Sequence, residues 1–394
     1  MAQPFYHTIL ALILITTGCA TGTENAGQPL IDISDSRAAP KTGAKSYILI
    51  NANSNTILSQ NNAHERLPPA SLTKLLSLYI IENHLKNGLA HNDDIAIVSK
   101  KARAAEGSRM FLEEGTHETI AKLIQGLIVT SGNDATITLA EHIAGSEEKF
   151  VELMNETAQK IGMHDSHFAN ATGLPHPNHY STAYDLGLLA WQFRHDHPES
   201  MQKLSQKWLN YNQIKQHNRN TLLWKNPAVT GMKTGHTKEA GFCLVASATE
   251  DGQDYLTVVL GDKTEQSRNQ STTMLLQHGQ RNFEHIAFTQ DPDIEPSRVW
   301  YSTARTTQAK FAHPLTISIP KGDSDIHKSI HVAQDIFAPA KANDVIGHYT
   351  LYLDNKPIAD ANLVLDRDLE SGSTLSAIRD WVAYHIQSLL NFSN

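Results

Sequence analysis

The sequence predicts an α+β fold, in which an antiparallel sheet packs against helices and a helical lobe stands beside it. Two observations predict this fold: apolar residues recur at helical spacing through much of residues 67–193, and β-rich runs at 242–247 and 255–260 flank an Asp-Gly turn. Short alternating segments broken by prolines follow from about 291. We therefore expect a larger domain over 45–288, with its cleft between sheet and lobe, and a small all-β domain over 291–370.

The first 44 residues are expected to precede the folded part. Residues 1–20 contain an apolar run too short to span a bilayer, followed by small residues, which is typical of an export signal, although no Lys or Arg precedes the run. Gly18-Cys19 also resembles a lipoprotein cleavage site, so lipidation of Cys19 stays open. Residues 21–44 are polar and contain glycine and proline, which predicts a linker.

The first elements of the larger domain are a hairpin and a buried helix. The hairpin is expected where β-rich segments at 47–50 and 56–58 flank a polar run. Two prolines then end an extended segment just before Ser71, and apolar residues follow at helical spacing, which predicts a buried helix that opens at this serine. The apolar residues are Leu72, Leu75, Leu76, Tyr79 and Ile80.

Four further helical segments follow. An apolar-periodic run over 120–128 and another from Ala135 place residues 131–133 at a junction between helices. A helix over 186–193 is expected to be capped by Asp185, and a helix around 274–283 closes the domain.

Three short motifs occur in an order that only one set of residues satisfies. They are Ser71-Leu72-Thr73-Lys74, Ser131-Gly132-Asn133 and Lys233-Thr234-Gly235. Each alone is weak and has chance copies, but no other combination of copies runs in this order. Three residues apart on a helix, Ser71 and Lys74 project from the same face, so that the amine can reach the hydroxyl. The third motif lies on or beside a strand of the sheet.

These residue types suggest nucleophilic catalysis. A serine hydroxyl needs a base, and no Ser-His-Asp arrangement is evident, so Lys74 is the local candidate, although 21 histidines keep a histidine base conceivable. Burial and a second cation such as Lys233 would lower the pKa of Lys74 until it could accept a proton. Zinc chemistry is disfavoured: His176/His179 and His195/His197 are closely spaced, but no H-E-x-x-H occurs. We expect no metal and no cofactor.

With these motifs the chain resembles the serine D-alanyl-D-alanine carboxypeptidases, the low-molecular-weight penicillin-binding proteins, over nearly its whole length. The resemblance implies a β-lactamase/transpeptidase-like catalytic domain followed by a β-rich domain. Further stretches that support it are Gly107-Ser108-Arg109-Met110-Phe111, Asn218-Arg219-Asn220, Leu222-Leu223-Trp224 and Gly231-Met232.

The resemblance implies acyl transfer on peptidoglycan stem peptides that end in D-Ala-D-Ala. Ser71 would attack the carbonyl between the two D-alanines, and water would hydrolyse the acyl-enzyme. Ser131 would relay protons and Asn133 would bond the substrate amide, while the backbone N–H groups of Ser71 and His236 would form the oxyanion hole. β-Lactam antibiotics would bind covalently to the same serine.

The resemblance also implies a clamp for the free terminal carboxylate. Lys233, Thr234 and Arg219 would hold it, with Gly235 in the same substrate-binding strand. A cationic clamp suits a carboxypeptidase because a chain end carries a charge that an internal bond lacks. The presence of the β-rich domain also favours this branch over the shorter endopeptidases.

Other functions stay open. A peptidoglycan DD-endopeptidase would share the site, and a scaffolding protein could keep the motifs without turnover. A serine β-lactamase fits less well, because class A enzymes use Ser-Asp-Asn and a downstream Glu. This chain has Ser-Gly-Asn and no Glu between Glu156 and Glu199.

Composition and the C-terminus bear on location. The formal charge of −8 gives no global attraction to nucleic acid, which is not an expected partner. Of the two cysteines, Cys243 is expected to pack as a small hydrophobe, without a disulfide.

The pattern of residues 373–394 predicts an amphipathic helix, which could dock on its own domain or lie on a membrane. The resemblance favours the outer, periplasmic face of the inner membrane. The apolar face comprises Leu375, Ile378, Trp381, Val382, Ile386, Leu389 and Phe392, and Asp380, Tyr384, Gln387 and Asn391 lie opposite.

Overall fold

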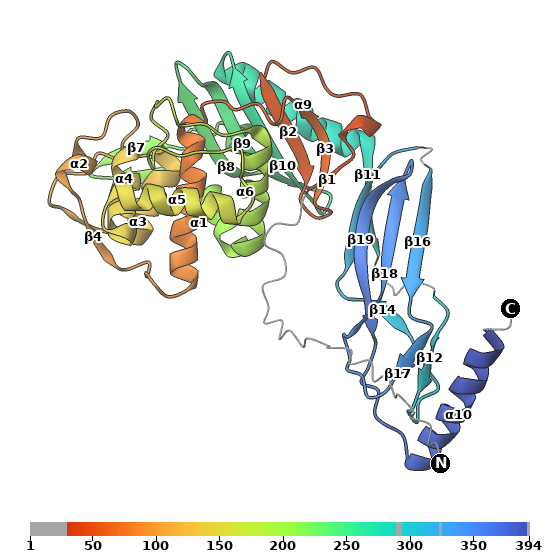
Figure 1. Cartoon of the computed structure of the whole chain (residues 1–394). Coiled ribbons are helices and arrows are strands. Elements are labelled where there is room, and N and C mark those ends of the chain that lie inside the picture. The colour runs from red at the N-terminus through yellow and green to blue at the C-terminus, as the bar shows by residue number, and fades with distance from the viewer. Residues whose placement is uncertain (1–29, 289–293, 323–324, 392–394) are drawn as a thin grey trace, which may run out of the picture.

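The computed structural model describes residues 30–288, 294–322 and 325–391. The expected export signal, Cys19 and the first part of the expected linker lie outside the described residues. Figure 1 shows a larger domain of sheet and helices, a β domain that extends away from it, and helix α10 at the far end of the β domain. The predicted α+β class is confirmed.

A six-stranded sheet forms the centre of the larger domain, in the order β1-β3-β2-β10-β9-β8. All neighbours are antiparallel except β1, which runs parallel to β3, and both expected hairpins are present. The strands are β1 (Ile31–Asp32), β2 (Ser46–Asn51), β3 (Thr56–Asn61), β8 (Val229–Thr237), β9 (Gly241–Glu250) and β10 (Gln253–Asp262).

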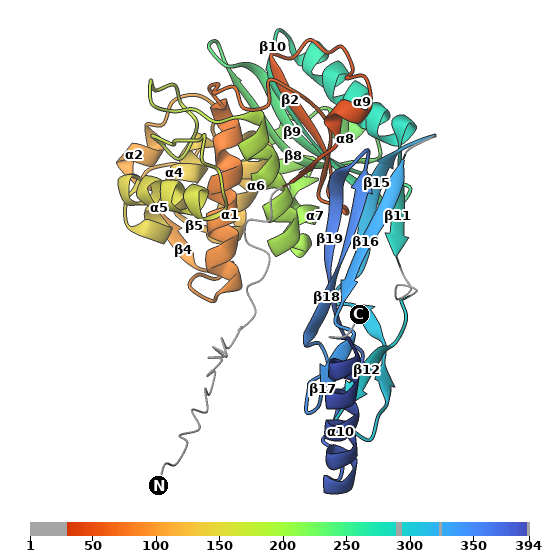
Figure 2. The same ribbon diagram turned by 45° about the vertical axis from the view of Figure 1, so that its right-hand side comes forward.

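Helices cover both faces of this sheet, with α1 and α6 on one side and α9 on the other (Figure 2). Alternate residues of β2 therefore enter different cores: Ile48 packs with the α1 and α6 side, and Leu49 with the α9 side. The helices are α1 (Thr73–Lys86), α2 (Lys100–Arg103), α3 (Ile120–Gln125), α4 (Asn133–Ala144), α5 (Glu147–Lys160), α6 (Ala183–Asp196), α7 (Met201–Leu204), α8 (Leu222–Lys225) and α9 (Glu265–Asn282).

Short elements complete the larger domain. Two small two-stranded sheets, one of them a hairpin, and several tight helical turns accompany the helices of the lobe. The hairpin is β6 (Trp208–Tyr211) with β7 (Ile214–His217), and β4 (Ile95–Ile97) pairs with β5 (His117–Thr119) across a segment that contains α2. The turns are the 3₁₀ turns η1 (Ser34–Ser36), η2 (Ala70–Leu72) and η4 (Pro198–Ser200), and the π-helical turn η3 (Gly126–Thr130).

Three expectations about this domain need correction. The expected linker 21–44 contributes β1 to the sheet, because Leu30 and Ile33 are buried on either side of that strand. Helix α6 is capped by Thr182, whose hydroxyl accepts a hydrogen bond from the Asp185 N–H at 3.0 Å, so Asp185 is not the cap. Helix α9 begins at Glu265, well before 274. The prediction missed its first half because that half is polar and shows no apolar periodicity.

The β domain begins earlier than expected. Helix α9 runs directly into β11 (Phe283–Phe288), which pairs with β15 (Leu315–Pro320), so the boundary lies at 282/283 and not at 288/291. The other strands form a three-stranded and a four-stranded sheet. They are β12 (Ser297–Trp300), β13 (Thr306–Thr307), β17 (Asp335–Phe337), β14 (Ala309–Phe311), β16 (Ile326–Val332), β18 (Val345–Leu353) and β19 (Lys356–Leu365).

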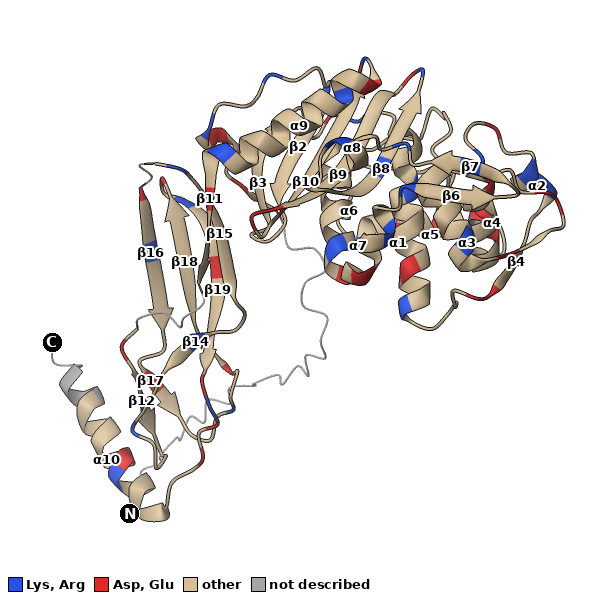
Figure 3. Ribbon diagram, turned by 180° about the vertical axis from the view of Figure 1, so that it is seen from behind, with Lys and Arg blue, Asp and Glu red and all other residues tan. Residues whose placement is uncertain are grey.

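Helix α10 (Thr374–Asn391) contacts the β domain through its polar face. Asp380 is 3% exposed and accepts a hydrogen bond from the Tyr301 N–H at 3.1 Å, while the ring of Tyr384 lies edge-on to Trp300. The apolar side chains point to solvent, with Leu375 83% and Ile378 61% exposed. Figure 3 shows few charged residues along the helix. Among the described residues, no helix is both long and apolar enough to cross a membrane.

Candidate active site

Ser71 and Lys74 meet where a tight turn becomes a helix. Ser71 lies in η2 and Lys74 in the first turn of α1, and Lys74 Nζ is 3.0 Å from Ser71 Oγ. The lysine is fully buried, and its Nζ also donates a hydrogen bond to the Thr172 carbonyl at 2.6 Å. The pairing expected from the three-residue spacing is present, and a loop 98 positions downstream supplies the second partner of the amine.

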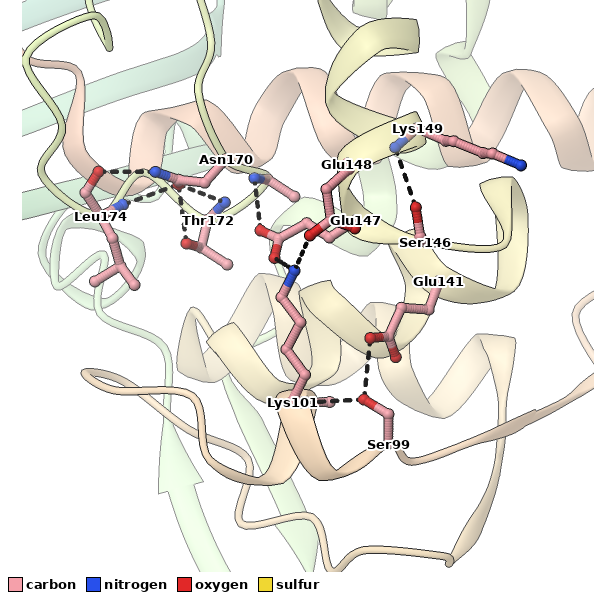
Figure 4. Close-up of polar contacts among 12 residues, drawn as sticks. Ser99, Lys101, Glu141, Ser146, Glu147, Glu148, Lys149, Asn170, Thr172 and Leu174 are labelled. Carbon is pink, nitrogen blue, oxygen red and sulfur yellow. Dashed lines mark hydrogen bonds and ion pairs between the residues drawn. The ribbon is translucent and has the colours of Figure 1, made fainter.

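The loop that carries Thr172 is held in place by one side chain and one glycine. The Asn170 Oδ1 accepts hydrogen bonds from the N–H groups of Thr172, Gly173 and Leu174, at 2.7 to 3.2 Å (Figure 4). Gly173 has a φ of +85°, and a Cβ there would lie 1.9 Å from the Ala70 carbonyl oxygen. Only glycine allows this loop to approach the turn that bears the serine.

A buried carboxylate fixes the other end of this loop. Glu147, the first residue of α5, accepts a hydrogen bond from the Ala171 N–H at 3.1 Å and pairs with Lys101 Nζ at 2.7 Å (Figure 4). Its side chain is 10% exposed. Glu147 therefore connects α2 and α5 to Ala171, the residue next to Thr172, whose carbonyl accepts a hydrogen bond from Lys74 Nζ. Sequence analysis missed this residue, since no motif contains it.

The second motif lies between η3 and α4, as expected. Ser131 adopts a left-handed conformation with φ of 57°, and its Oγ accepts a hydrogen bond from Lys233 Nζ at 2.9 Å. Asn133 begins α4, and its Nδ2 donates to the Glu106 carbonyl at 2.6 Å. The Asn133 Oδ1 is buried and has no hydrogen-bond partner among the described residues. Asn133 is 4% exposed and is not among the residues that line the hollow described below.

The residue after the second motif has a structural role that sequence analysis also missed. Asp134 accepts hydrogen bonds from the N–H groups of Met110, Phe111 and Leu112 at 2.8 to 3.0 Å. The carboxylate thereby ties the 106–112 loop to the start of α4, next to Asn133. The only sequence signal was its adjacency to the motif.

The third motif lies on β8, which packs closely against η2. A Cβ on Gly235 would lie 2.9 Å from the Pro69 carbonyl oxygen and 3.2 Å from the Leu72 nitrogen, so a side chain would push the strand away from the turn. A hollow of about 300 Å³ opens at this junction. The predicted residues that line it are Ser71, Ser131, Arg219, Thr234, Gly235 and His236.

Two lysines under the hollow have lowered pKa values. Burial, followed by the nearby Lys233 ammonium, lowers the pKa of Lys74 well below its ordinary value. Burial, followed by the Arg219 and Arg268 guanidinium groups, lowers the pKa of Lys233 to about 7. The lowered pKa favours the neutral amine of Lys74, which is the form that could take the Ser71 proton, as the residue types suggested.

Arg268 is a site residue that sequence analysis did not find. It is 3% exposed, lies in the polar first half of α9 and lines the hollow together with Arg219. Its Nη2 donates to Asn269 Oδ1 at 2.9 Å. Arg219 and Arg268 supply two cations to the lining, where Glu265 lies 3.6 Å from Arg268 Nη2, and the remaining positive charge suits an anionic group of a ligand.

The histidines considered for zinc do not converge. His179 Nε2 lies 2.7 Å from Thr73 Oγ1, His197 Nε2 lies 2.9 Å from Asn83 Oδ1, and the ring of His195 stacks on Trp191. The described residues contain no group of three or more His, Cys, Asp or Glu that could hold a metal ion.

A larger hollow of about 520 Å³ lies between α6, α7 and the ends of β9 and β10. None of the predicted site residues lines it, and its ionic groups, Arg194 and Asp254, pair with each other. The smaller hollow is the candidate active site, since the nucleophile and its amine meet there.

Comparison with known proteins decides the family. Residues 33–264 match the family model described as D-alanyl-D-alanine carboxypeptidase, and residues 283–371 match the C-terminal domain of penicillin-binding protein 5. The D-alanyl-D-alanine carboxypeptidase DacA of Haemophilus influenzae is 37% identical over 89% of this chain and 92% of its own length. The chain belongs to the serine D-alanyl-D-alanine carboxypeptidase family.

Other members of the carboxypeptidase family match this chain over most of its length and have a similar fold. The carboxypeptidase DacD of Escherichia coli is 35% identical over 87% of this chain and 91% of its own length. The crystal structure of penicillin-binding protein 5 from Haemophilus influenzae, 37% identical, covers 85% of this chain and all of its own, with a TM-score of 0.78. The carboxypeptidase domain and the β domain are thus both shared with relatives.

Proposed function

We propose that this chain removes the terminal D-alanine from peptidoglycan pentapeptides through an acyl-enzyme on Ser71. The observation that carries the proposal is the 3.0 Å contact between Ser71 Oγ and the buried Lys74 Nζ, whose pKa is lowered. Lys74 takes the hydroxyl proton as Ser71 attacks the carbonyl between the two D-alanines. D-Alanine leaves with a proton, and water then hydrolyses the ester.

The other motif residues serve the same step. Ser131, whose Oγ lies 2.9 Å from Lys233 Nζ, passes a proton to the leaving amine. The free Oδ1 of Asn133 accepts from the substrate amide N–H. The backbone N–H groups of Ser71 and His236 stabilise the oxyanion, in a site that Gly235 brings together.

A cationic wall selects the end of a chain. Lys233 and Arg219, with Thr234, hold the free carboxylate of the terminal D-alanine, and Arg268 adds charge to the same wall. This favours carboxypeptidase over endopeptidase action, because an internal peptide bond has no carboxylate to place there. An endopeptidase remains the second candidate function, since the catalytic groups would be the same.

The site would capture β-lactams and hydrolyse them slowly. The penicillin-binding protein D2 of Listeria monocytogenes, 25% identical with a TM-score of 0.57 over 62% of this chain, has been solved in an ampicillin-bound form. In our chain the loop beside Lys74 has no carboxylate between Asp165 and Asp185 that could activate a deacylating water. This argues against a β-lactamase.

The test is D-alanine release from a peptide that ends in D-Ala-D-Ala, repeated with Ser71→Ala. We expect release by the unmodified chain and none by the variant. Penicillin capture at Ser71 without D-alanine release would favour the endopeptidase, and rapid penicillin hydrolysis would favour the β-lactamase. Release that survives in Ser71→Ala would overturn the proposal.

We also propose that the chain works in the periplasm, attached to the outer face of the inner membrane. The exposed apolar face of α10, including Leu375 and Ile378, supports this, because the polar face is already used against the β domain. A lipid on Cys19 would be a second attachment. In a Cys19→Ala background, deletion of 373–394 should release the protein into the soluble periplasmic fraction; retention on the membrane would refute the anchor.

A further inference from the structure

A cluster of aromatic side chains stands at the rim of the active-site hollow. Trp208 on β6, His217 on β7 and Trp224 on α8 lie edge-on to one another, with ring centroids 5.9 to 6.2 Å apart. Trp208 is 47% and Trp224 41% exposed, although indoles are usually largely buried. Lys215 Nζ lies 4.6 Å from the centre of the Trp208 ring, and Lys207 Nζ lies 5.8 Å from that of Trp224.

The cluster is continuous with the site. His217 pairs across the β6–β7 hairpin with Trp208, and the same histidine lines the hollow together with Ser71 and Arg219. Exposed apolar surface rimmed by cations marks a binding surface more often than a defect in packing. The two indoles therefore adjoin the hollow through His217.

We propose that these aromatic residues bind sugar rings of the glycan strand to which the stem peptide is attached. The inference rests on the proposed function, since it assumes that a D-Ala-D-Ala end occupies the hollow. A pyranose ring presents a face of C–H groups that stacks on an indole, and its hydroxyl rim can face ammonium groups. Lys207 and Lys215 also suit the free carboxylates of a stem peptide.

The cluster adjoins the hollow through His217. The Trp208 and Trp224 rings lie 6.1 and 6.2 Å from the ring of this histidine, which lines the hollow. Three residues, which span at most about 10 Å when extended, separate the cleaved pair from the sugar. A stem peptide that left the hollow past His217 would carry its sugar towards the indoles.

The test compares three substrates: an acylated D-Ala-D-Ala, the sugar-free pentapeptide, and the same pentapeptide on its disaccharide. Trp208→Ala should lower kcat/KM about tenfold on the disaccharide substrate and leave the other two within about twofold. Trp208→Phe, which keeps an aromatic face, should restore most of the loss. Ile214→Ala is the matched control, since Ile214 is 40% exposed on the same hairpin but lies outside the cluster.

Other outcomes would overturn the inference. An equal loss on all three substrates would mean that Trp208 only supports the hollow, and a loss on both pentapeptides would assign the surface to peptide. No loss on any substrate would leave the indoles without the proposed ligand.

A second readout separates this inference from the proposed function. Peptide-free glycan chains should bind Ser71→Ala and shift its tryptophan fluorescence, and Trp208→Ala in that background should abolish the shift. If the unmodified chain released no D-alanine yet bound glycan in this way, the proposed function would fail and the glycan surface would stand. Absence of the shift in Ser71→Ala would overturn the glycan surface alone.

Discussion

The catalytic hollow and helix α10 use polar and apolar side chains in opposite ways. Under the hollow, Lys74 and Lys233 are 0% and 3% exposed, and their amines have specific oxygen partners. On α10 the apolar residues Ile378 and Trp381 are 61% and 55% exposed, while the buried group is Asp380. Both regions place side chains where solvation alone would not put them, which costs free energy and is consistent with the functions proposed for them.

This difference predicts how strongly a single substitution should affect each region. A buried amine depends on a few directional contacts, so the loss of one partner should change the chemistry by orders of magnitude. The membrane attachment proposed for the exposed face of α10 would depend on buried area, so single substitutions should give small effects that add.

The largest effect is expected from Lys74→Met. Methionine keeps the length of the buried side chain but cannot take the Ser71 proton, so penicillin acylation and D-alanine release should both fall by roughly 10²- to 10⁴-fold. Stopped-flow acylation with a fluorescent penicillin measures this, with thermal unfolding to show that the variant is folded. An acylation rate within tenfold of the unmodified chain would reopen a histidine base.

Arg219→Gln should have the next largest effect, on binding of the free carboxylate. Loss of a charge-assisted contact of about 1.5–3 kcal/mol should raise KM roughly 10- to 150-fold for a D-Ala-D-Ala acid. A peptide whose last carboxylate is amidated is the control, and its KM should change little. An equal change for both peptides would remove Arg219 from the clamp.

The pH profile should respond to the same substitution. Lys233 is cationic below its pKa of about 7 and neutral above it, so activity that needs the ammonium should decline as pH rises through that value. Arg219 is one cause of the lowered pKa, and its removal should move this decline to higher pH. A basic limb of kcat/KM that stays in place in Arg219→Gln would show that Lys233 is not the group that titrates.

A more moderate effect is expected from Glu147→Ala, which leaves the Ala171 N–H without its acceptor and frees the loop under Lys74. We expect kcat to fall about tenfold with little change in KM, because the loop holds the amine and touches no substrate. Glu147→Gln should recover most of kcat, since an amide oxygen can still accept from Ala171. A change confined to thermal stability would reduce Glu147 to a structural residue.

The sequence was most informative where chemistry restricts residue type. The order of the motifs identified Ser71, Lys74, Ser131 and Lys233, and the structure joins them in pairs although Ser131 and Lys233 are 102 positions apart. Local periodicity likewise predicted the two main hairpins and α1. Both a periodic pattern within one segment and the order of motifs along the chain can be recognised from the sequence without knowledge of the fold.

The residues that were missed act through long-range contacts. Thr172 contributes only a carbonyl oxygen, which any residue type could supply, and Glu147 contacts a backbone N–H 24 positions away. Arg268 enters the site from a helix whose polar half gave no signal. The sequence predicted the apolar face of α10. Only the tertiary structure shows that Asp380 and Tyr384, on the opposite face, contact the β domain.

The smallest effect is expected on α10. Val382→Ala removes two carbons from a side chain that is 44% exposed, and at half burial in lipid this corresponds to about 0.8 kcal/mol, or roughly fourfold in partitioning. In a Cys19→Ala background, sedimentation with phosphatidylethanolamine and phosphatidylglycerol vesicles measures this. Val345→Ala, a control at a 56% exposed valine in β18, should leave partitioning unchanged. The rate of D-alanine release in solution should be the same for the Cys19→Ala protein and for both valine variants, because α10 is proposed to supply membrane-binding area and makes no contact in the hollow. A lower rate in Val382→Ala alone would show that α10 and the hollow are coupled.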